Sequence, residues 1–327
     1  MSVGEKALIA RIRRLSSRTK NSVIRIGIGD DCAVLRLARG RKNKDSDLLV
    51  TTDFSLEGIH FKREWHTPES IGHRCLARGF SDLAAMGGTP VAAFLSLALP
   101  RDLPRGWVDR FMRSLLGLAS RYSVTLAGGD TAESPNGILA DIVVAGTAPG
   151  GKAVLRSRAR AGDRIYVSGE LGAAAAALVQ MRKTNKRKLN PREYRRHFFP
   201  EPRIELGRIL REKGLASAMI DTSDGLSTDL AHICEESGVG AEIEADLIPR
   251  ATIGKPPRKV DLELALHGGE DYELLFTAPR SKSIPLRIAG IPIHPIGHIT
   301  RTGRIFLMNR NGAGSELKPQ GWEHFRR

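Results

Sequence analysis

The stretch Gly27-Ile28-Gly29-Asp30-Asp31-Cys32 places two adjacent carboxylates directly behind two glycines. Glycine lets the backbone turn tightly and lets a ligand approach it closely. Paired carboxylates in such a turn suit a hard cation such as Mg²⁺, which takes oxygen ligands and often shares them with phosphate. An Asp-Asp turn is more often a solvated loop, so the rest of the chain has to decide between the two interpretations.

Short acidic segments flanked by glycine or hydroxyl residues recur along the chain. They are Thr51-Thr52-Asp53, Ser81-Asp82, Gly128-Gly129-Asp130-Thr131, Asp221-Thr222-Ser223-Asp224-Gly225 and Gly268-Gly269-Glu270-Asp271. Any one of these carboxylates alone could cap a helix or fill a turn. If the segments converge, neighbouring charges repel by roughly 4 kcal/mol at 4 Å under an effective dielectric near 20. Bound Mg²⁺ would reverse the sign of the cleft, so these residues predict a nucleotide site with several Mg²⁺ ions.

Composition limits the class of protein. The 327 residues are long enough for two domains, and no apolar run approaches the roughly 18 residues of a membrane span. Three isolated cysteines and an N-terminal stretch without a signal-peptide core lead us to expect a cytoplasmic protein. The net charge is +15, and eight Lys/Arg with one Glu gather between 182 and 196. Because aromatic residues are only 5%, we expect no nucleic-acid partner, and we expect this basic segment to be a solvated loop outside the site.

Helix and strand patterns alternate in both halves of the chain. The spacing predicts helices over 5–15, 68–86, 104–122, 171–181, 203–213, 226–237 and 261–267. It predicts strands over 23–27, 33–37, 48–52, 91–99, 124–127, 138–147, 164–168, 217–220, 241–244, 272–277, 293–296 and 304–308. The stretch Ala148-Pro149-Gly150-Gly151 marks a boundary. We therefore predict an α/β chain of two α+β domains, 1–148 and 149–327.

Common catalytic and phosphate-binding motifs are absent from the sequence. The run from Gly146 through Gly151-Lys152 begins like a phosphate-binding loop, but Ala153 stands where Ser or Thr would hold Mg²⁺. No HExxH or GxSxG segment occurs. A nucleotide site in this chain must therefore depend on the acidic segments.

Together the acidic segments resemble those of the thiamine-monophosphate kinase family, in order and with the family's spacing. They are Gly-Ile-Gly-Asp-Asp-Cys-Ala at 27–33, Thr-Thr-Asp at 51–53 with Gly-Ile-His-Phe at 58–61, Ser-Asp-Leu-Ala-Ala-Met-Gly at 81–87, Gly-Gly-Asp-Thr at 128–131, Ile-Asp-Thr-Ser-Asp-Gly-Leu at 220–226 and Gly-Gly-Glu-Asp-Tyr-Glu-Leu at 268–274. The resemblance implies the two-domain fold of the aminoimidazole ribonucleotide synthetase superfamily. In that fold the N-terminal domain would bind ATP and Mg²⁺ and dimerise through its sheet, and the C-terminal domain would complete the cleft.

The resemblance also implies roles for individual residues. The Mg²⁺-binding positions would be Asp31, Thr51, Thr52, Asp53, Asp82, Asp130, Asp221 and Asp224. The nucleotide contacts would be Gly129, Asp130, Arg156 and Ser223, and the contacts to thiamine phosphate would be His60, Glu270 and Trp322. Asp53, Asp221 and Asp224 would be the catalytic carboxylates, and Asp30 would orient its neighbour.

The activity that the resemblance implies is transfer of the ATP γ-phosphoryl group to the phosphate of thiamine monophosphate, in a homodimer and without a phosphoenzyme. Both reactants are anionic, so charge neutralisation and positioning should carry most of the catalysis. Another ATP-dependent enzyme of the superfamily, similar to selenophosphate synthetase or to the hydrogenase-maturation dehydratase, is an alternative. A basic RNA-binding protein is a more distant one.

Overall fold

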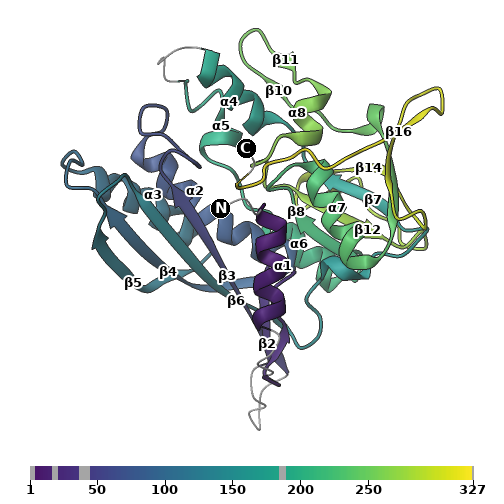
Figure 1. Cartoon of the computed structure of the whole chain (residues 1–327), viewed down its shortest axis with the longest axis horizontal. Coiled ribbons are helices and arrows are strands. Elements are labelled where there is room, and N and C mark those ends of the chain that lie inside the picture. Colours follow the sequence, from purple (N-terminus) through teal and green to yellow (C-terminus); the bar gives the residue numbers. More distant parts are fainter. Residues whose placement is uncertain (1–3, 17–20, 37–44, 184–188, 326–327) are drawn as a thin grey trace.

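The structure of the chain, a computed structural model, describes residues 4–16, 21–36, 45–183 and 189–325. It contains two large β-sheets, and Figure 1 shows the N-terminal sheet on the left and the C-terminal sheet on the right. This arrangement confirms the predicted α/β fold with a sheet in each half. Among the described residues, no helix has the length and apolar character needed to cross a membrane.

The N-terminal sheet has six strands in the order β1-β2-β3-β6-β4-β5. Their bounds are Ile24–Ile26 (β1), Ala33–Arg36 (β2), Ser46–Leu56 (β3), Leu139–Pro149 (β6), Thr89–Leu99 (β4) and Thr125–Glu133 (β5). Only β4 and β5 run parallel, and the other neighbours are antiparallel. Burial alternates along β3 and β6 with the period of two that places successive side chains on opposite faces.

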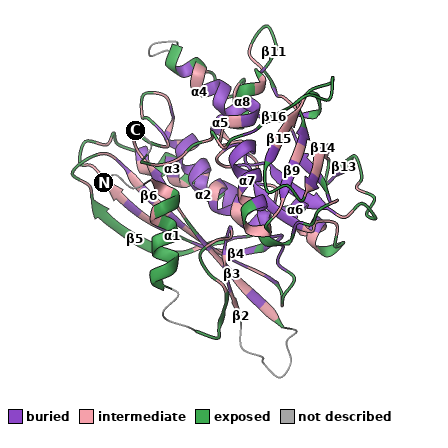
Figure 2. Ribbon diagram, turned by 45° about the vertical axis from the view of Figure 1, so that its right-hand side comes forward, coloured by how far each residue is buried: buried purple, intermediate pink, exposed green. Residues whose placement is uncertain are grey.

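Helices α2 (Pro68–Ala85) and α3 (Trp107–Arg121) pack against each other beside this sheet. α2 begins at Thr67, whose hydroxyl accepts a hydrogen bond from the Ser70 amide at 3.2 Å, as expected of an N-cap. α3 begins three residues later than predicted because Gly106 has a φ of 74°, which no α-helix contains. Figure 2 shows α2 buried along most of its length, whereas β5 and α1 (Glu5–Ser16) are largely exposed.

The C-terminal sheet has the path β16-β15-β9-β14-β7-β12-β8, and β13 pairs with β14. The strand bounds are Arg164–Ser168 (β7), Ala218–Asp221 (β8), Gly240–Glu244 (β9), Leu274–Ala278 (β12), Arg287–Ile288 (β13), Ile291–Thr300 (β14), Ile305–Met308 (β15) and Gly314–Glu316 (β16). The helices of this half are Ala173–Lys183 (α4), Arg195–Phe198 (α5), Ile204–Glu212 (α6), Leu226–Ser237 (α7) and Leu262–His267 (α8), with a small hairpin of Thr252–Ile253 (β10) and Arg258–Lys259 (β11).

α2 lies between the two halves of the molecule. It contacts β3, β6 and β4 of the first sheet, β8 of the second, and helices α3, α5 and α6. Glycines permit the closest of these approaches: a Cβ on Gly72 would lie 2.2 Å from the Phe111 carbonyl oxygen, and one on Gly207 would lie 2.0 Å from the Ala84 carbonyl oxygen. The position of α2 is therefore fixed by backbone-to-backbone packing from both sides.

Two of the acidic segments lie differently from their prediction. Thr51-Thr52-Asp53 was expected to end a strand, but β3 continues to Leu56, so these residues lie within it. Gly128-Gly129-Asp130-Thr131 was expected in a turn after a strand over 124–127, but it lies inside β5. In both cases the strand continues because its neighbours pair with it along the whole length. The short elements α5, β10, β11, β13 and β16 had no predicted counterpart.

Substitution of Gly72 tests the packing of α2. We expect Gly72→Ala to lower the free energy of unfolding by about 1–3 kcal/mol, because the new methyl group would overlap the Phe111 carbonyl oxygen. Gly117→Ala is the matched control: Gly117 is a helical glycine of α3 with no atom within 4 Å of a new Cβ, so the change should stabilise by about 0.5–1 kcal/mol. Urea denaturation measures both, and equal midpoints for the two variants would contradict the close approach.

Candidate active site

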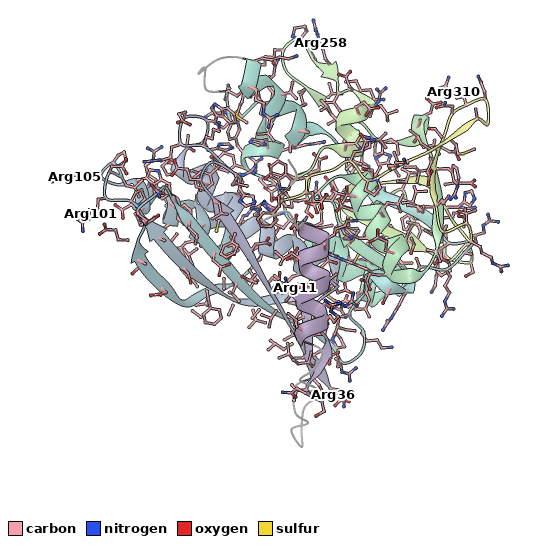
Figure 3. All side chains as sticks on the ribbon, viewed as in Figure 1. Arg11, Arg36, Arg101, Arg105, Arg258 and Arg310 are labelled. Carbon is pink, nitrogen blue, oxygen red and sulfur yellow. The ribbon has the colours of Figure 1, made fainter. Side chains whose placement is uncertain are left out.

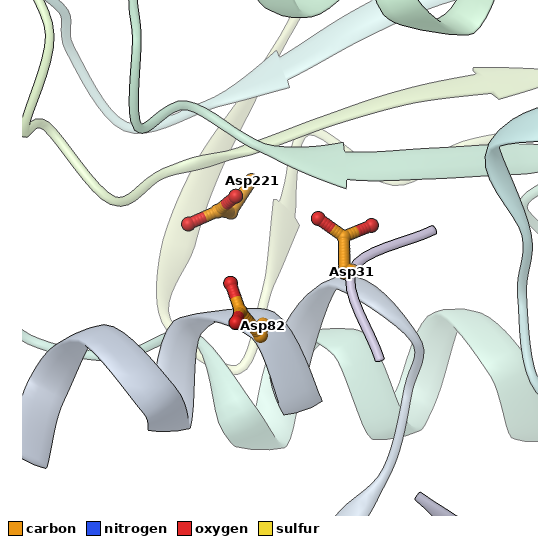
Figure 4. A group of neighbouring side chains, drawn as sticks. All are labelled: Asp31, Asp82 and Asp221. Atoms are coloured by element: carbon orange, nitrogen blue, oxygen red, sulfur yellow. The ribbon is translucent and has the colours of Figure 1, made fainter. Parts of the chain in front are cut away.

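Three carboxylates from separate parts of the chain meet between the two halves. Asp31 lies in the turn before β2, Asp82 lies on α2, and Asp221 ends β8. One oxygen atom from each lies within 4.8 Å of the others, and Figure 4 shows the three side chains facing one another. The sequence predicted all three as metal ligands, and the structure brings them together.

Neighbouring groups hold each carboxylate of this cluster in place. The Arg156 guanidinium binds Asp31 with two hydrogen bonds, Nη2 to Oδ1 at 2.7 Å and Nε to Oδ2 at 3.2 Å. The Ser81 hydroxyl donates to Asp221 Oδ2 at 2.6 Å, and the Thr51 hydroxyl donates to Asp82. Hydrogen bonds to the charged form of a carboxylate favour that form.

Asp30 lies beside the cluster and holds its backbone. Its carboxylate accepts hydrogen bonds from the Asp31 amide at 3.1 Å and from the Arg156 amide at 3.3 Å. It therefore fixes both partners of the Asp31–Arg156 ion pair.

Burial and mutual repulsion raise the pKa of most carboxyl groups in this region. Burial, followed by the charges of Asp53 and Asp221, raises the pKa of Asp82 well above its usual value. Burial and Asp31 raise the pKa of Asp221 to about 7. Burial also raises the pKa of Asp53, although Arg78 opposes it. A hard cation would keep all of these groups ionised, and an all-oxygen donor set fits Mg²⁺.

Another acidic residue, Asp141, lies on the face of the N-terminal sheet that is opposite to α2. The Thr52 hydroxyl donates to Asp141 Oδ1 at 2.7 Å, while the buried Thr51 one residue earlier faces α2. The register Phe54–Asp141–Ser96–Asp130 runs across β3, β6, β4 and β5. Asp141 was not predicted, because a single acid in the apolar run 138–147 carries no motif.

Gly129 and Asp130 are not brought to the acidic cluster of their own chain. They are exposed on the edge strand β5, three strand spacings from β3, which is roughly 14 Å. Gly129 has a φ of 153°, and a Cβ there would lie 1.8 Å from the Leu95 carbonyl oxygen. The sequence could not show this separation, because it depends on the order of the strands.

A cleft of about 810 Å³ joins the acidic cluster to the remaining predicted residues. Its wall includes Thr52, Asp53, His60, Lys62, Trp65, His66, Arg78, Asp82, Asp221, Ser223, Asp224, Glu270, Tyr272 and Trp322. Most of the predicted metal, nucleotide and acceptor residues thus line one cleft. Asp31, Thr51 and Arg156 lie behind its wall, and Gly129 and Asp130 lie elsewhere, on β5.

The turn after β8 supplies two of these wall residues, Ser223 and Asp224. Burial, followed by Glu5, raises the pKa of Asp224 to about 6. Asp229 of α7 accepts a hydrogen bond from the Gly225 amide at 2.9 Å and so holds the turn at the start of the helix. Its role was not predicted, because within a helical pattern Asp229 resembles any polar residue.

His60 presents a hydrogen-bond donor to the cleft. Its Nδ1 accepts a hydrogen bond from the Leu56 amide at 3.0 Å, so the proton of the neutral ring resides on Nε2. Burial and the nearby Arg78 lower the pKa of His60 to about 3, so the ring is neutral at physiological pH. His60 is therefore suited to donate a hydrogen bond and unsuited to act as an acid.

Glu270 is an ionised carboxylate between two arginines of α2. Arg74 Nη2 lies 2.5 Å from its Oε1, and Arg78 Nη2 lies 3.6 Å away. Burial opposes ionisation, but the two guanidinium groups outweigh it and lower the pKa of Glu270 to about 2. Glu270 and Tyr272 have φ angles of 69° and 51°, which are unusual for residues other than glycine and are found at functional sites.

Trp322 lies at the mouth of the cleft and is half exposed. Its backbone amide donates to the Asp224 carbonyl at 3.0 Å, and the His324 ring contacts its indole edge to face at 5.7 Å. An aromatic residue that only covered a core edge would be more deeply buried. This position leaves indole surface available for a ligand.

The basic segment is not separate from the site, contrary to the prediction. Arg182 lines the cleft, and His197 on α5 is 1% exposed and contacts His66. Residues 184–188 of this segment lie outside the described part of the chain. The charge count could not show that His197, which directly follows the exposed Arg195 and Arg196, is buried.

Comparison with known proteins agrees with this geometry. The chain matches the AIR synthase related protein family, with the N-terminal domain over residues 29–150 and the C-terminal domain over residues 160–308. It is 37% identical to the thiamine-monophosphate kinase of Salmonella typhimurium, over 99% of both chains. A solved structure described as AaThiL complexed with AMPPCP and TMP has a TM-score of 0.82 at 32% identity, covering 98% of this chain and 97% of that one. The thiamine-monophosphate kinase structure from Stenotrophomonas maltophilia has a TM-score of 0.72 at 35% identity, covering 96% and 99%.

The two matched domains and the acidic cleft between them define an AIR synthase related protein. Within that class, the 37% sequence identity over nearly the full length identifies the family. The chain belongs to the thiamine-monophosphate kinase family. Membership in a kinase family makes it an enzyme, as the sequence predicted.

Removal of one carboxylate tests the cation site. In EDTA we expect Asp82→Asn to raise the thermal midpoint by at least about 2 °C, because the change removes a half-buried carboxyl group whose ionisation is opposed by desolvation and by two neighbouring acids. In Mg²⁺ the wild type should gain more stability than the variant, since it binds the ion more tightly. Differential scanning calorimetry measures both midpoints.

Asp163→Asn is the control for this comparison. Asp163 is buried and accepts hydrogen bonds from the Ser217 hydroxyl at 2.6 Å and the Arg160 amide at 3.1 Å, and among the described residues it belongs to no cluster of carboxylates. This variant should be destabilised in both buffers. A lower midpoint for Asp82→Asn in EDTA would show that its carboxyl group is not repelled in the apoprotein.

Proposed function

We propose that the chain transfers the γ-phosphoryl group of ATP to the phosphate of thiamine monophosphate. The observation that carries this proposal is the cleft whose wall includes Asp82 and Asp221 of the three-carboxylate cluster together with His60, Glu270 and Trp322. The related structure that contains AMPPCP and TMP supports it. Purified protein with ATP, Mg²⁺ and a panel of phosphorylated acceptors tests it, and ADP release with other acceptors but not with thiamine monophosphate would overturn it.

Asp31, Asp82 and Asp221, with Asp53 and Asp224 from the same cleft, are the residues that would hold Mg²⁺. Bound Mg²⁺ would supply positive charge to the phosphates. Arg156, Ser81 and Thr51 hold the carboxylates in the orientations described above. Ser223, on the turn after β8, is placed to contact the nucleotide from the cleft wall.

The acceptor phosphate requires no proton removal, because it is already ionised at neutral pH. The cleft agrees with this requirement, since the pKa of His60 is lowered to about 3 and the ring acts only as a donor. Arg78 lies between Glu270 and Asp53 and donates from Nη1 to the Phe54 carbonyl at 2.6 Å. The chain's own residues therefore position two anionic groups and leave the reaction to direct in-line transfer.

We also propose a homodimer formed through the N-terminal sheet. The outward side chains Phe54, Val91 and Phe94 are 54%, 53% and 40% exposed, which leaves an apolar surface on this sheet. In a two-fold dimer the same face of both copies would meet, and the edge strand β5 of one copy would lie near the other. This arrangement would bring Gly129 and Asp130 to the partner's cleft, which accounts for their distance from the cluster of their own chain.

We also propose that the protein works in the cytoplasm. The three cysteines are free and buried, which supports a reducing compartment. Figure 3 shows Arg36, Arg101, Arg258 and Arg310 at separate edges of the molecule.

Truncation of Trp322 tests acceptor recognition. An indole face attracts a cation such as the thiazolium ring by about 0.5–2 kcal/mol, so Trp322→Ala should raise the KM for thiamine monophosphate roughly 2–30-fold. The KM for ATP should change little, and Trp322→Phe should recover part of the loss. Steady-state kinetics with each substrate varied in turn measures this, and an equal rise in both KM values would favour a structural role.

Mixing of two inactive variants tests the dimer. Asp53→Asn and Asp130→Asn should each be nearly inactive as homodimers. If Asp130 acts in the partner's cleft, random heterodimers restore one intact site each, or about a quarter of wild-type activity in an equal mixture. Light scattering first confirms the dimer. A monomer, or verified heterodimers without recovered activity, would contradict the shared site.

A further inference from the structure

A pair of buried histidines links the basic segment to the cleft. His66, at the end of the loop 57–66, and His197, on α5, are 3% and 1% exposed, and their Nε2 atoms are 2.9 Å apart. The loop also carries His60, Lys62 and Trp65, all of which line the cleft. The chemistry described above makes no use of either ring of the pair.

Arg74 and Lys62 contact the two outer sides of this pair. A guanidinium group can only donate, and Arg74 Nη1 lies 2.5 Å from the His197 carbonyl oxygen and 3.5 Å from His197 Nδ1. On the other side, the Lys62 amide donates to His66 Nδ1 at 3.3 Å, and the Lys62 carbonyl oxygen lies 3.2 Å from the same nitrogen. Between the rings, the Nε2 atom that carries the proton donates to the other Nε2 at 2.9 Å.

One Nε2 must accept for this hydrogen bond to form, so the two rings cannot both be protonated. Burial and Arg74 lower the pKa of His66 to about 4 and the pKa of His197 well below its usual value. The charged or titratable groups that face the pair are Arg74 and Glu270. The pair is thus a fixed structural connection across the neutral pH range.

The other end of the connection is Glu270. The second nitrogen of the Arg74 guanidinium, Nη2, donates to Glu270 Oε1 at 2.5 Å. A continuous path of hydrogen bonds therefore runs from Lys62 through His66, His197 and Arg74 to Glu270. One end of this path lies in the loop 57–66 and the other in the segment before β12. Both segments contribute residues to the cleft wall.

We propose that His66 and His197 are positioning residues that set the acceptor half of the cleft by fixing the loop 57–66 relative to Glu270. This inference rests on the proposed function and adds two residues to which no role in the reaction was assigned. It also gives the end of the basic segment a role, because α5 supplies both the His197 ring and the carbonyl group that binds Arg74.

A purely packing role is the competing explanation. The Phe198 ring lies 5.5 Å from His66 and 5.0 Å from His197, so the pair does belong to an aromatic group. An apolar side chain of similar volume would preserve packing of this kind and remove the hydrogen bonds. Leucine meets this condition for histidine.

The experiment compares four variants by steady-state kinetics with thiamine monophosphate and ATP varied separately. His197→Leu and His66→Leu should each raise the KM for thiamine monophosphate roughly 5–30-fold, since each leaves one buried group without its partner. The KM for ATP should stay within about twofold. His197→Gln, whose side-chain amide can either donate to or accept from His66, should recover most of the loss. The double Leu variant should lose less than the product of the single losses, because it leaves no unpaired nitrogen.

His73→Leu is the matched control. His73 is a buried histidine like the pair, but it lies on α2. Its Nε2 donates to the Pro200 carbonyl at 2.7 Å, just after α5, and this hydrogen bond does not lead to Glu270. This variant should lose thermal stability without a selective change in KM. If His197→Leu does not yield folded protein, His66→Leu carries the same test from the opposite side of the pair.

The outcomes separate the inference from the function on which it rests. No turnover of thiamine monophosphate by the wild type would defeat the proposed function. Wild-type turnover with equal changes in both KM values, with no recovery in His197→Gln, or with the same selective change in His73→Leu would overturn the positioning role alone.

Discussion

Mutual repulsion of buried carboxylates is the constraint on which the rest of the structure depends. Asp31, Asp82 and Asp221 come from three separate segments. Because their negative charges repel one another, other contacts in the fold must hold them together. The packing of α2 against α3 and α6 through Gly72 and Gly207 supplies rigidity. The cost of the cluster is then offset by the apolar cores on either side of it.

Sequence reasoning found the residues of the cluster because each acidic segment carried glycine or hydroxyl neighbours that identified it. Asp141 lacks such neighbours, and Asp229, although it follows Ser227-Thr228, lies in the pattern of an ordinary helix. The location of Asp130 depends on strand order, which no local pattern contains. The fold class and most long elements could be predicted from periodicity, whereas 128–131 could not, because its two glycines masked a strand that pairing with β4 stabilises.

Only some residues of the acceptor side of the cleft could be predicted from the sequence. Glu270 could be identified by resemblance, but the partners that keep it ionised, Arg74 and Arg78, look like the polar face of any amphipathic helix. Net charge was similarly misleading for the basic segment. A count of Lys and Arg does not reveal that His197, at the end of the segment, is buried.

α2 has a consequence for how this enzyme can change during evolution. Arg74, Arg78 and Asp82 are spaced four residues apart on one side of the helix, so about 12 Å along the axis separates the contact to Glu270 from the cation cluster. A single-residue insertion between Arg78 and Asp82 would rotate one group by about 100° relative to the other. The length of this helical segment therefore fixes the distance between the Glu270 contact and the cation cluster, and an insertion or deletion within it would disrupt one of the two.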